Sequence, residues 1–228
     1  MIPIPAYNAL SPADAIALQK QMRDRLQITP LEKEIKLIGG ADISFNKFEE
    51  TVYAGIIVLS YPDMVPVAKV AVTTTATFPY ISGLLAFREV PALTVAWNAL
   101  ETKPDLLVLD GHGIAHGRRM GIAAHFGLLA NIPTIGCAKT RLTGTFTEPE
   151  NSRFAQTPLM HQQEQIGVVL RTKINCKPVF VSPGNRVSME QSVTIIQNCV
   201  GCYRIPEPTR LAHNLVNETR IAAGKKKL

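Results

Sequence analysis

The sequence predicts an α/β protein with one mixed sheet, in which three antiparallel strands precede parallel βαβ units and helices flank the sheet. Two observations favour this class. Three successive runs rich in Ile, Val and Thr are separated by short turn-like breaks, which is typical of an antiparallel meander. Beyond them, short apolar runs alternate with helical patterns, and such alternation requires parallel neighbouring strands.

The N-terminal elements follow from spacing and turn residues. A helix is expected over residues 11–27, because Pro12 suits the first helical position and Leu18, Met22 and Leu26 recur at helical intervals. The three β-like runs cover residues 35–45, 52–61 and 65–75, and the breaks between them contain Asn46-Lys47 and Pro62-Asp63.

The later elements alternate. We expect a helix over 91–100 beginning near Pro91, a strand at 105–109, a helix around 120–130 and a strand at 132–136. Further β-like runs cover 166–172 and 178–182, and helices are expected at 187–199 and from about residue 208 onward. This order is the outline of a ribonuclease H-like fold. There the first strand and the first parallel strand are neighbours, which would bring Asp42 and Asp110 side by side.

Composition describes a compact globular protein. With 228 residues, 46% hydrophobic and 18% charged, we expect one domain over residues 1–228, monomeric, with a disordered basic tail at 224–228. The chain has no apolar run long enough to span a bilayer and no signal peptide, so we expect a cytoplasmic protein without a membrane partner. A net charge of +6 favours a polyanionic partner.

The cysteines predict no metal site. Cys199 and Cys202 have C-x-x-C spacing, but no second pair completes a zinc site, so packed, reduced thiols are favoured over a metal or redox role.

Three acids carry the chemical hypothesis. Asp110 follows the apolar run 106–109 and enters a glycine-bracketed turn, while Asp42 ends a similar strand. Two adjacent carboxylates repel unless a cation lies between them, and such oxygen ligands suit Mg²⁺. The alternative is that each Asp only caps a turn. Glu89, which precedes the expected helix start, is either a third acid of the site or a charge favoured by the helix dipole.

Basic and apolar groups surround these acids. Basic side chains are expected beside acids where a metal and a phosphate lie between them. The basic residues near the candidate acids, all expected in loops, are Arg88, Arg118, Arg119, Lys139 and Arg141. The apolar, glycine-hinged loop 78–89 is of the kind that inserts into a base stack or replaces an extracted base.

The chain resembles the endonuclease V family, nucleases that repair deaminated purines. The resemblance extends from about residue 35 to His213 and rests on six separated motifs. These are residues 40–45, 79–89, 109–113, 136–139, 181–185 and 206–213.

The resemblance implies a role for each catalytic candidate. Asp42 and Asp110 would be metal ligands for Mg²⁺, with Mn²⁺ as a substitute, and Glu89 would complete the acidic centre directly or through water. Lys139 would bind or polarise the scissile phosphate, and His213 would orient water or assist proton transfer.

The resemblance also implies a pocket for a flipped base. Its lining is mapped onto Gly83, Leu85, Gly111, Gly121, Ile122 and Leu142. Glycine at 111 and 121 suits close approach of the backbone to a planar base. Tyr80 would be the wedge in the opened duplex, although it could be only a partly buried loop aromatic, and Ile81, Arg88 and His116 are assigned to DNA contact. The family loop commonly reads Pro-Tyr-Ile-Pro, whereas this chain has Ser82, which should loosen the loop slightly.

The remaining histidines receive weaker assignments. His112 could contact DNA or face solvent, and His125 and His161 are expected to be structural. His112 and His116 are four apart, but the surrounding glycines argue against a helical zinc motif.

The resulting expectation is a metal-dependent DNA repair endonuclease. By resemblance it would recognise deoxyinosine and hydrolyse the second phosphodiester bond 3′ to the lesion, leaving 5′-phosphate products. The alternatives are an inosine-specific ribonuclease acting on RNA and a catalytically silent nucleic-acid-binding protein, which would not need acids that repel phosphate. A dinucleotide-binding domain is disfavoured because no G-x-G-x-x-G follows a strand.

Overall fold

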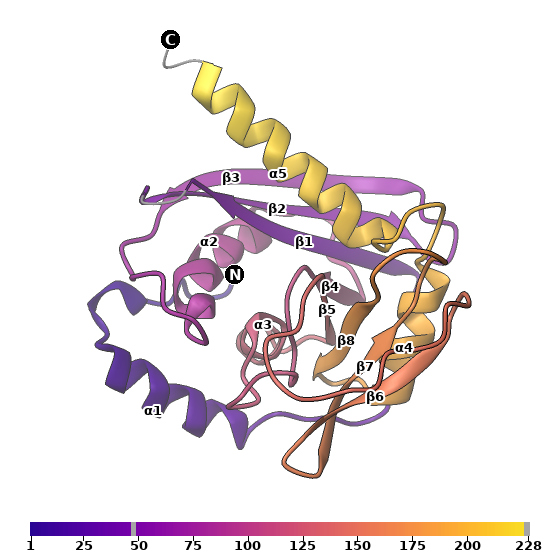
Figure 1. Cartoon of the computed structure of the whole chain (residues 1–228). Helices are drawn as coiled ribbons and strands as arrows, with labels where there is room; N and C mark the ends of the chain where they lie inside the picture. The colour runs from indigo at the N-terminus through magenta and orange to yellow at the C-terminus, as the bar shows by residue number, and fades with distance from the viewer. Residues whose placement is uncertain (47–48, 226–228) are drawn as a thin grey trace.

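The structure is a computed structural model that describes residues 1–46 and 49–225. Its centre is an eight-stranded sheet in the order β3-β2-β1-β4-β5-β8-β7-β6 (Figure 1). The strands are β1 (Leu37–Phe45), β2 (Thr51–Ser60), β3 (Pro66–Thr75), β4 (Leu106–Leu109), β5 (Thr134–Ala138), β6 (Gln156–His161), β7 (Glu164–Leu170) and β8 (Val179–Asn185). The helices are η1 (Tyr7–Ala9), α1 (Pro12–Arg23), α2 (Leu85–Ala99), α3 (Ile122–Ala130), α4 (Met189–Asn198) and α5 (Glu207–Lys225).

The strand pairing confirms the predicted mixed sheet. β1, β2 and β3 form an antiparallel meander, and β4 and β5 join β1 in parallel. The remaining strands, β8, β7 and β6, continue the sheet in antiparallel fashion. The sheet is therefore ribonuclease H-like, with β1 and β4 as neighbours, as the element order predicts.

Two helical layers bury the two faces of the sheet. On one face, Phe87 of α2 and Phe126 of α3 belong to the same buried cluster as the β1 and β2 residues. On the other face, Ile196 of α4 and Ala212 of α5 pack in a second cluster with β4, β7 and β8. Figure 1 shows α5 crossing the meander and continuing past the edge of the sheet. Burial of this apolar area provides the main stabilisation of the fold.

Gly40 lets α5 lie directly on β1. A Cβ built at this position would be 1.9 Å from the carbonyl oxygen of Pro208, in the first turn of the helix. Only glycine permits this approach. The contact fixes the start of α5 close to the strand that carries Asp42.

Several boundaries differ from the sequence prediction. Helix α2 begins at Leu85, so Pro91 is inside the helix and not at its start. Helix α1 ends at Arg23, and strand β6 was not predicted. Helix α5 is described as far as Lys225, whereas 226–228 and Lys47 of the first expected turn lie outside the described residues, so the disordered tail at 224–228 stays a prediction.

The cysteines match their expected state in part. Cys199 is buried, as predicted for a packed thiol, but Cys202 is exposed. Among the described residues, neither belongs to a cluster that could hold a metal ion. None of the helices in that part of the chain combines the length and the apolar character that crossing a bilayer would require.

Candidate active site

Asp42 and Asp110 meet at adjacent strand ends. The parallel register pairs Ala41 with Leu109, and the backbone N–H of Asp110 donates to the carbonyl of Ala41 at 3.0 Å. One ligand atom each from Asp42, Asp110 and His213 lie within 4.8 Å of one another. The predicted meeting of the two acids is confirmed, and it results from the β1–β4 neighbour relation.

Helix α5 brings His213 to Asp42. The Nδ1–H of His213 donates to Oδ2 of the Asp42 carboxylate at 2.6 Å. One turn later, the amide Nδ2–H of Asn217 donates to His213 Nε2 at 2.9 Å. Both ring nitrogens thus have protein partners, so in this arrangement His213 orients Asp42 and does not present a free nitrogen to water. Asn217 was not singled out from the sequence, although its i+4 spacing from His213 would have placed it there.

Lys139 follows β5 and forms an ion pair with Asp110. Its backbone is held from the other side, because Nη2 of Arg204 donates to the Lys139 carbonyl at 2.8 Å. The ammonium group is therefore placed at the acidic centre by the strand end and by the loop that precedes α5.

Glu89 lies in the second turn of α2 and not at the helix N-terminus, because the helix begins four residues earlier. Burial and, to a smaller extent, the charges of Asp42 and Asp110 raise the pKa of Glu89 to about 8, while Arg88 opposes the shift. Glu89 is therefore part of the same electrostatic cluster as the two aspartates.

The acidic cluster has the properties of a divalent-cation site. Burial raises the pKa of Asp42 to about 6, and the charge of Asp110 adds to the effect, while His213, Lys139 and the Ile43 N–H oppose it. Two neighbouring carboxylates repel each other when both are ionised, and a cation bound between them offsets this repulsion. The hard oxygen donors of Asp42 and Asp110 fit Mg²⁺ or Mn²⁺. The cluster of Asp42, Asp110 and His213 therefore suggests a site for a divalent ion.

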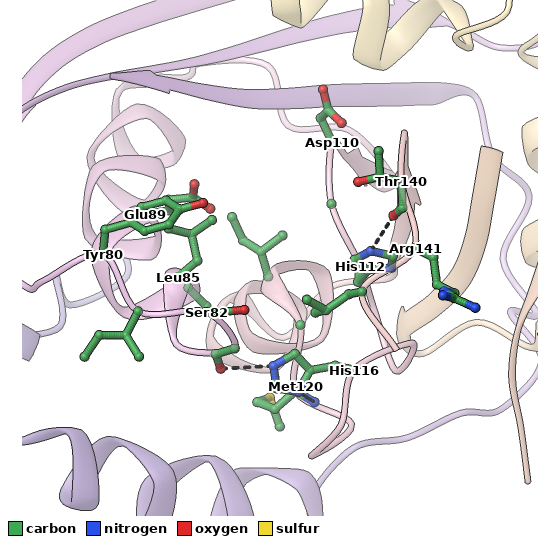
Figure 2. A pocket seen from close by; sticks show the side chains of 17 residues that line it. Tyr80, Ser82, Leu85, Glu89, Asp110, His112, His116, Met120, Thr140 and Arg141 are labelled. Carbon is green, nitrogen blue, oxygen red and sulfur yellow. Dashed lines mark hydrogen bonds between the residues drawn. The ribbon is translucent and has the colours of Figure 1, made fainter. Parts of the chain in front are cut away.

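A small pocket opens beside the acids. Its volume is about 290 Å³, near the lower limit of roughly 300 Å³ for small-ligand sites. Figure 2 shows Tyr80, Leu85 and Glu89 along one side and His112, Thr140 and Arg141 along the other. All predicted lining positions contribute: Gly83, Leu85, Gly111, Gly121, Ile122 and Leu142, together with Tyr80, Ile81 and His116. Met120 and Thr140 also line it and were not predicted.

The loop before α2 presents an exposed aromatic side chain at the pocket rim. Tyr80 is 68% exposed, and its ring centroid is 6.1 Å from that of Phe45. The alternative of a partly buried loop aromatic therefore does not describe it. Ser82 lies at the pocket wall beside it.

Two of the pocket glycines, Gly111 and Gly121, have packing reasons of their own. A Cβ at Gly121 would lie 2.2 Å from the carbonyl oxygen of His112, and one at Gly111 would lie 2.6 Å from Ile122 Cγ2. The nearest obstacles are thus protein atoms. The expected reason, close approach of a base to the backbone, is not needed to explain either glycine.

Two predicted DNA contacts occupy interior positions. Arg88 is in α2, not in a loop, and its guanidinium donates to the carbonyls of Ala76 and Phe78, both at 2.8 Å. It is 7% exposed, and His116 is 3% exposed, with Nε2 bonded to the carbonyl of Gly83 at 3.0 Å. In this structure both residues hold the loop that carries Tyr80 and present little surface to a nucleic acid.

The expected structural histidines do have structural partners. His125 is fully buried and bonded to the Tyr7 hydroxyl at 2.8 Å, and His161 contacts Arg119 at 3.2 Å. His112 bonds to the carbonyl of Thr140 at 3.0 Å beneath the pocket, so it does not simply face solvent.

A ribonuclease H-like sheet with one carboxylate on β1 and a second directly after β4 is typical of a nuclease of that fold. The sequence profile of the Endonuclease V family matches residues 20–214. The chain is 42% identical over 217 residues to Endonuclease V from Myxococcus xanthus, a match that covers 95% of this chain and 92% of the relative. The chain therefore belongs to the endonuclease V family.

Solved structures of relatives have the same fold. Endonuclease V from Streptomyces avermitilis superposes with a TM-score of 0.91 at 35% identity, covering 98% of this chain and 99% of the other. Ciona intestinalis Endonuclease V has a TM-score of 0.80 at 28% identity, covering 92% and 98%. The Ciona protein was crystallised with a 24-mer DNA that contains an inosine followed by a ribo-adenosine.

Proposed function

We propose that this protein is a Mg²⁺-dependent DNA repair endonuclease that recognises deoxyinosine. It would hydrolyse the second phosphodiester bond 3′ to the lesion and leave 3′-hydroxyl and 5′-phosphate ends. The observation that carries the proposal is the position of the acids Asp42, Glu89 and Asp110 at the edge of a pocket rimmed by the exposed Tyr80. The inosine-containing DNA bound by the Ciona relative supports the same substrate.

Each acidic and basic side chain of the site has its own proposed role. Asp42 and Asp110 would hold the divalent ion, which when bound stabilises charge on phosphate oxygens and lowers the pKa of water. Lys139, which forms an ion pair with Asp110, would bind a non-bridging phosphate oxygen. His213 keeps Asp42 oriented through its Nδ1–H. Glu89, whose carboxyl feels the charges of both aspartates, would complete the acidic centre directly or through water.

The pocket and loop would select the lesion. A cavity of about 290 Å³ admits one base at most, and Leu85 and Ile122 supply apolar walls for its faces. Extraction of a base leaves a gap in the stack, and the exposed Tyr80 ring is placed to fill it. The remaining DNA would contact the basic side chains around the site, and binding would weaken as salt rises.

Cleavage mapping tests this proposal directly. A duplex with one deoxyinosine should be cut in Mg²⁺ or Mn²⁺ one nucleotide beyond the lesion, an adenine duplex should remain intact, and EDTA should abolish the cut. Asp110→Asn should lose at least about 10³-fold in rate, because it weakens the metal site. Asp63→Asn, which changes an exposed acid in the β2–β3 turn, should cut like the wild type. Retained activity in Asp110→Asn would refute the metal mechanism.

The second candidate is an inosine-specific ribonuclease. The Ciona relative accommodates a ribonucleotide immediately after the inosine, which shows that its site tolerates a 2′-hydroxyl there. The single-turnover cleavage rates of matched DNA and RNA strands with one inosine should therefore be compared. The strand that is cleaved faster is the main substrate. We propose that the enzyme acts as a monomer in the cytoplasm.

A further inference from the structure

The carbonyl group of Gly83 anchors the end of the Tyr80 loop that leads into α2. Gly83 closes the loop with φ +78°, a left-handed conformation that favours glycine, and the N–H of Leu84 donates to the carbonyl of Ile81 at 2.9 Å. Tyr80 at the tip is mostly exposed, whereas Leu84 is 2% exposed. The position of the tip therefore depends on how firmly the base of the loop is held.

Three side chains donate to the carbonyl oxygen of Gly83. They are Gln19 Nε2 at 3.0 Å, His116 Nε2 at 3.0 Å and Arg118 Nη2 at 2.8 Å. A carbonyl oxygen has two lone pairs, so three donors saturate it. We call Gln19, His116 and Arg118 the Gly83 bracket. The donors come from α1 and from the segment before α3, so the bracket ties the loop to two distant parts of the chain.

Gln19 also bonds to Arg118 and to the backbone of Met120. Its side chain is fully buried, its Nε2 also donates to the carbonyl of Met120 at 3.3 Å, and its Oε1 accepts from Arg118 Nε. Gly83 and Met120 both line the pocket. A single amide from the N-terminal helix thereby joins the two walls of the pocket, although Gln19 itself does not line it.

The protonation of His116 follows from its partners. The Nδ1 atom accepts from the backbone N–H of Arg118 at 3.0 Å and of Met120 at 3.4 Å, so the proton resides on Nε2 and is donated to Gly83. Burial lowers the pKa of His116 to about 4, which keeps the ring neutral at physiological pH. The bracket is thus formed by one neutral imidazole, one amide and one guanidinium.

We propose that Gln19 is a positioning residue for lesion recognition, acting with Arg118 through the Gly83 carbonyl to hold the Tyr80 loop against the pocket. The inference rests on the proposed function, because it assigns the loop a task in opening the duplex. Gln19 would not touch the substrate. Loss of its amide would let the loop tip move, and a misplaced Tyr80 would impair base extraction more than it impairs phosphodiester hydrolysis.

A matched glutamine provides the control. Gln191 in α4 also bonds to a distant backbone, accepting from the Leu31 N–H at 2.7 Å and donating to its carbonyl at 2.9 Å, but it lies outside the pocket. Gln19→Met and Gln191→Met both replace an amide by an apolar side chain of similar length. Both should lower the melting temperature, and only Gln19→Met should change lesion recognition.

Two measurements separate positioning from stability. In hydrogen exchange of the free protein, amides 81–85 should exchange at least about tenfold faster in Gln19→Met than in the wild type and Gln191→Met. In single-turnover cleavage, Gln19→Met should lose about tenfold on an inosine duplex, and much less on the same strand unpaired, where no duplex has to be opened. Gln191→Met should cut both substrates at wild-type rates.

Unchanged loop exchange, or an equal loss on duplex and single strand, would overturn the inference. A wild-type protein that cuts neither inosine substrate would instead refute the proposed function, and loop exchange would still test the bracket. If Gln19→Met does not fold, Arg118→Met removes one Gly83 donor from a more exposed position, and exchange of the same amides without DNA should again accelerate.

Discussion

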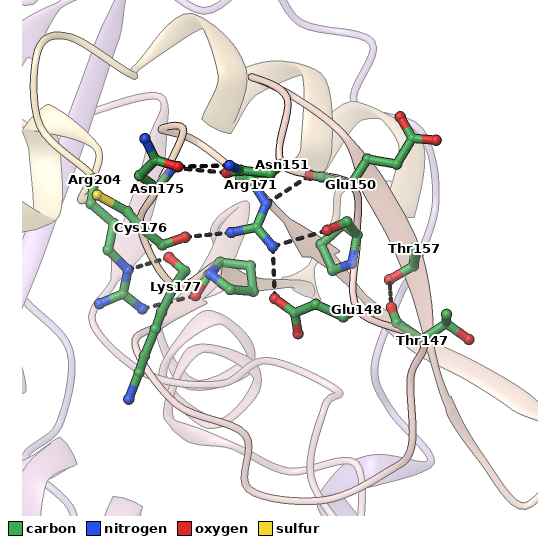
Figure 3. Close-up of polar contacts among 12 residues, drawn as sticks. Thr147, Glu148, Glu150, Asn151, Thr157, Arg171, Asn175, Cys176, Lys177 and Arg204 are labelled. Carbon is green, nitrogen blue, oxygen red and sulfur yellow. Dashed lines mark hydrogen bonds and ion pairs between the residues drawn. The ribbon is translucent and has the colours of Figure 1, made fainter.

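Arg171 is expected to be the most sensitive single arginine for stability away from the active site. It follows β7 and is 7% exposed (Figure 3). Its Nε donates to the Glu150 carbonyl at 2.7 Å, Nη1 to the Cys176 carbonyl, and Nη2 to the Pro149 carbonyl at 2.9 Å and to Glu148 Oε1 at 2.7 Å. One guanidinium thus joins the segment after the Lys139 loop to the β7–β8 connection.

The free energy lost in Arg171→Met can be worked from these contacts. The carboxylate of Glu148 is 60% exposed, so the ion pair contributes at most about 1 kcal/mol. The carbonyl bonds to a charged donor contribute roughly 1 kcal/mol each, since the freed loops can bind water. We expect the free energy of unfolding to fall by about 4 kcal/mol in all, equivalent to roughly 8–16 °C in melting temperature for a chain of this size.

Thermal unfolding followed by circular dichroism measures this change. Arg153→Met is the matched control, because Arg153 is exposed and makes one long bond to the Val200 carbonyl at 3.3 Å. It should shift the melting temperature by no more than about 2 °C. If Arg171→Met melts within about 3 °C of the wild type, the assigned bond energies are wrong. At 25 °C the folded variant should still bind a divalent ion, since its acidic centre is unchanged.

Three further changes have defined outcomes. Asn217→Leu removes the donor to His213 Nε2 and should slow inosine cleavage about tenfold at pH 7.5, with a melting temperature close to wild type. Burial lowers the pKa of His125 to about 3 from 6.5, so the unfolded chain binds the extra proton and stability falls as pH drops below 6.5. We expect the free energy of unfolding, measured by urea titrations between pH 6.5 and 4.5, to fall by up to about 1.4 kcal/mol less per pH unit in His125→Gln than in the wild type. An equal pH dependence in the two proteins would argue against a neutral buried ring. Gly40→Ala places a Cβ 1.9 Å from the Pro208 carbonyl oxygen and should lower the free energy of unfolding by about 3 kcal/mol in the same titrations. An unchanged free energy of unfolding would mean that α5 can shift freely.

Topology was the part of the site that sequence could predict. Asp42 and Asp110 are far apart along the chain, but a meander followed by a βαβ unit makes their strands neighbours, and the register Ala41↔Leu109 confirms it. Hydrophobic periodicity reports such element order well, because it reflects which face of each element is buried.

Element ends and side-chain partners could not be predicted in the same way. Pro91 indicated a helix start, but the turn before it is already helical, so Arg88 points inward to carbonyls and not toward DNA. Strand β6 was missed because Pro158 lies within it, and proline is tolerated there since β6 is the edge strand.

Gln19 shows a different limit. Nothing in its local pattern distinguishes it from the other glutamines of the first helix, and its importance arises only when α1 packs next to Gly83 and Met120. Contacts between distant segments depend on the final packing, which local periodicity does not encode.

The bond between His213 and Asp42 joins residues 171 positions apart, one in the first strand and one in the last helix. During synthesis the sheet around Asp42 and Asp110 can assemble while α5 is still inside the ribosome. At that stage the chain has a collapsed core but an incomplete catalytic centre. The site should therefore be complete only after α5 has docked on β1, so chains that lack this helix should not cut an inosine duplex.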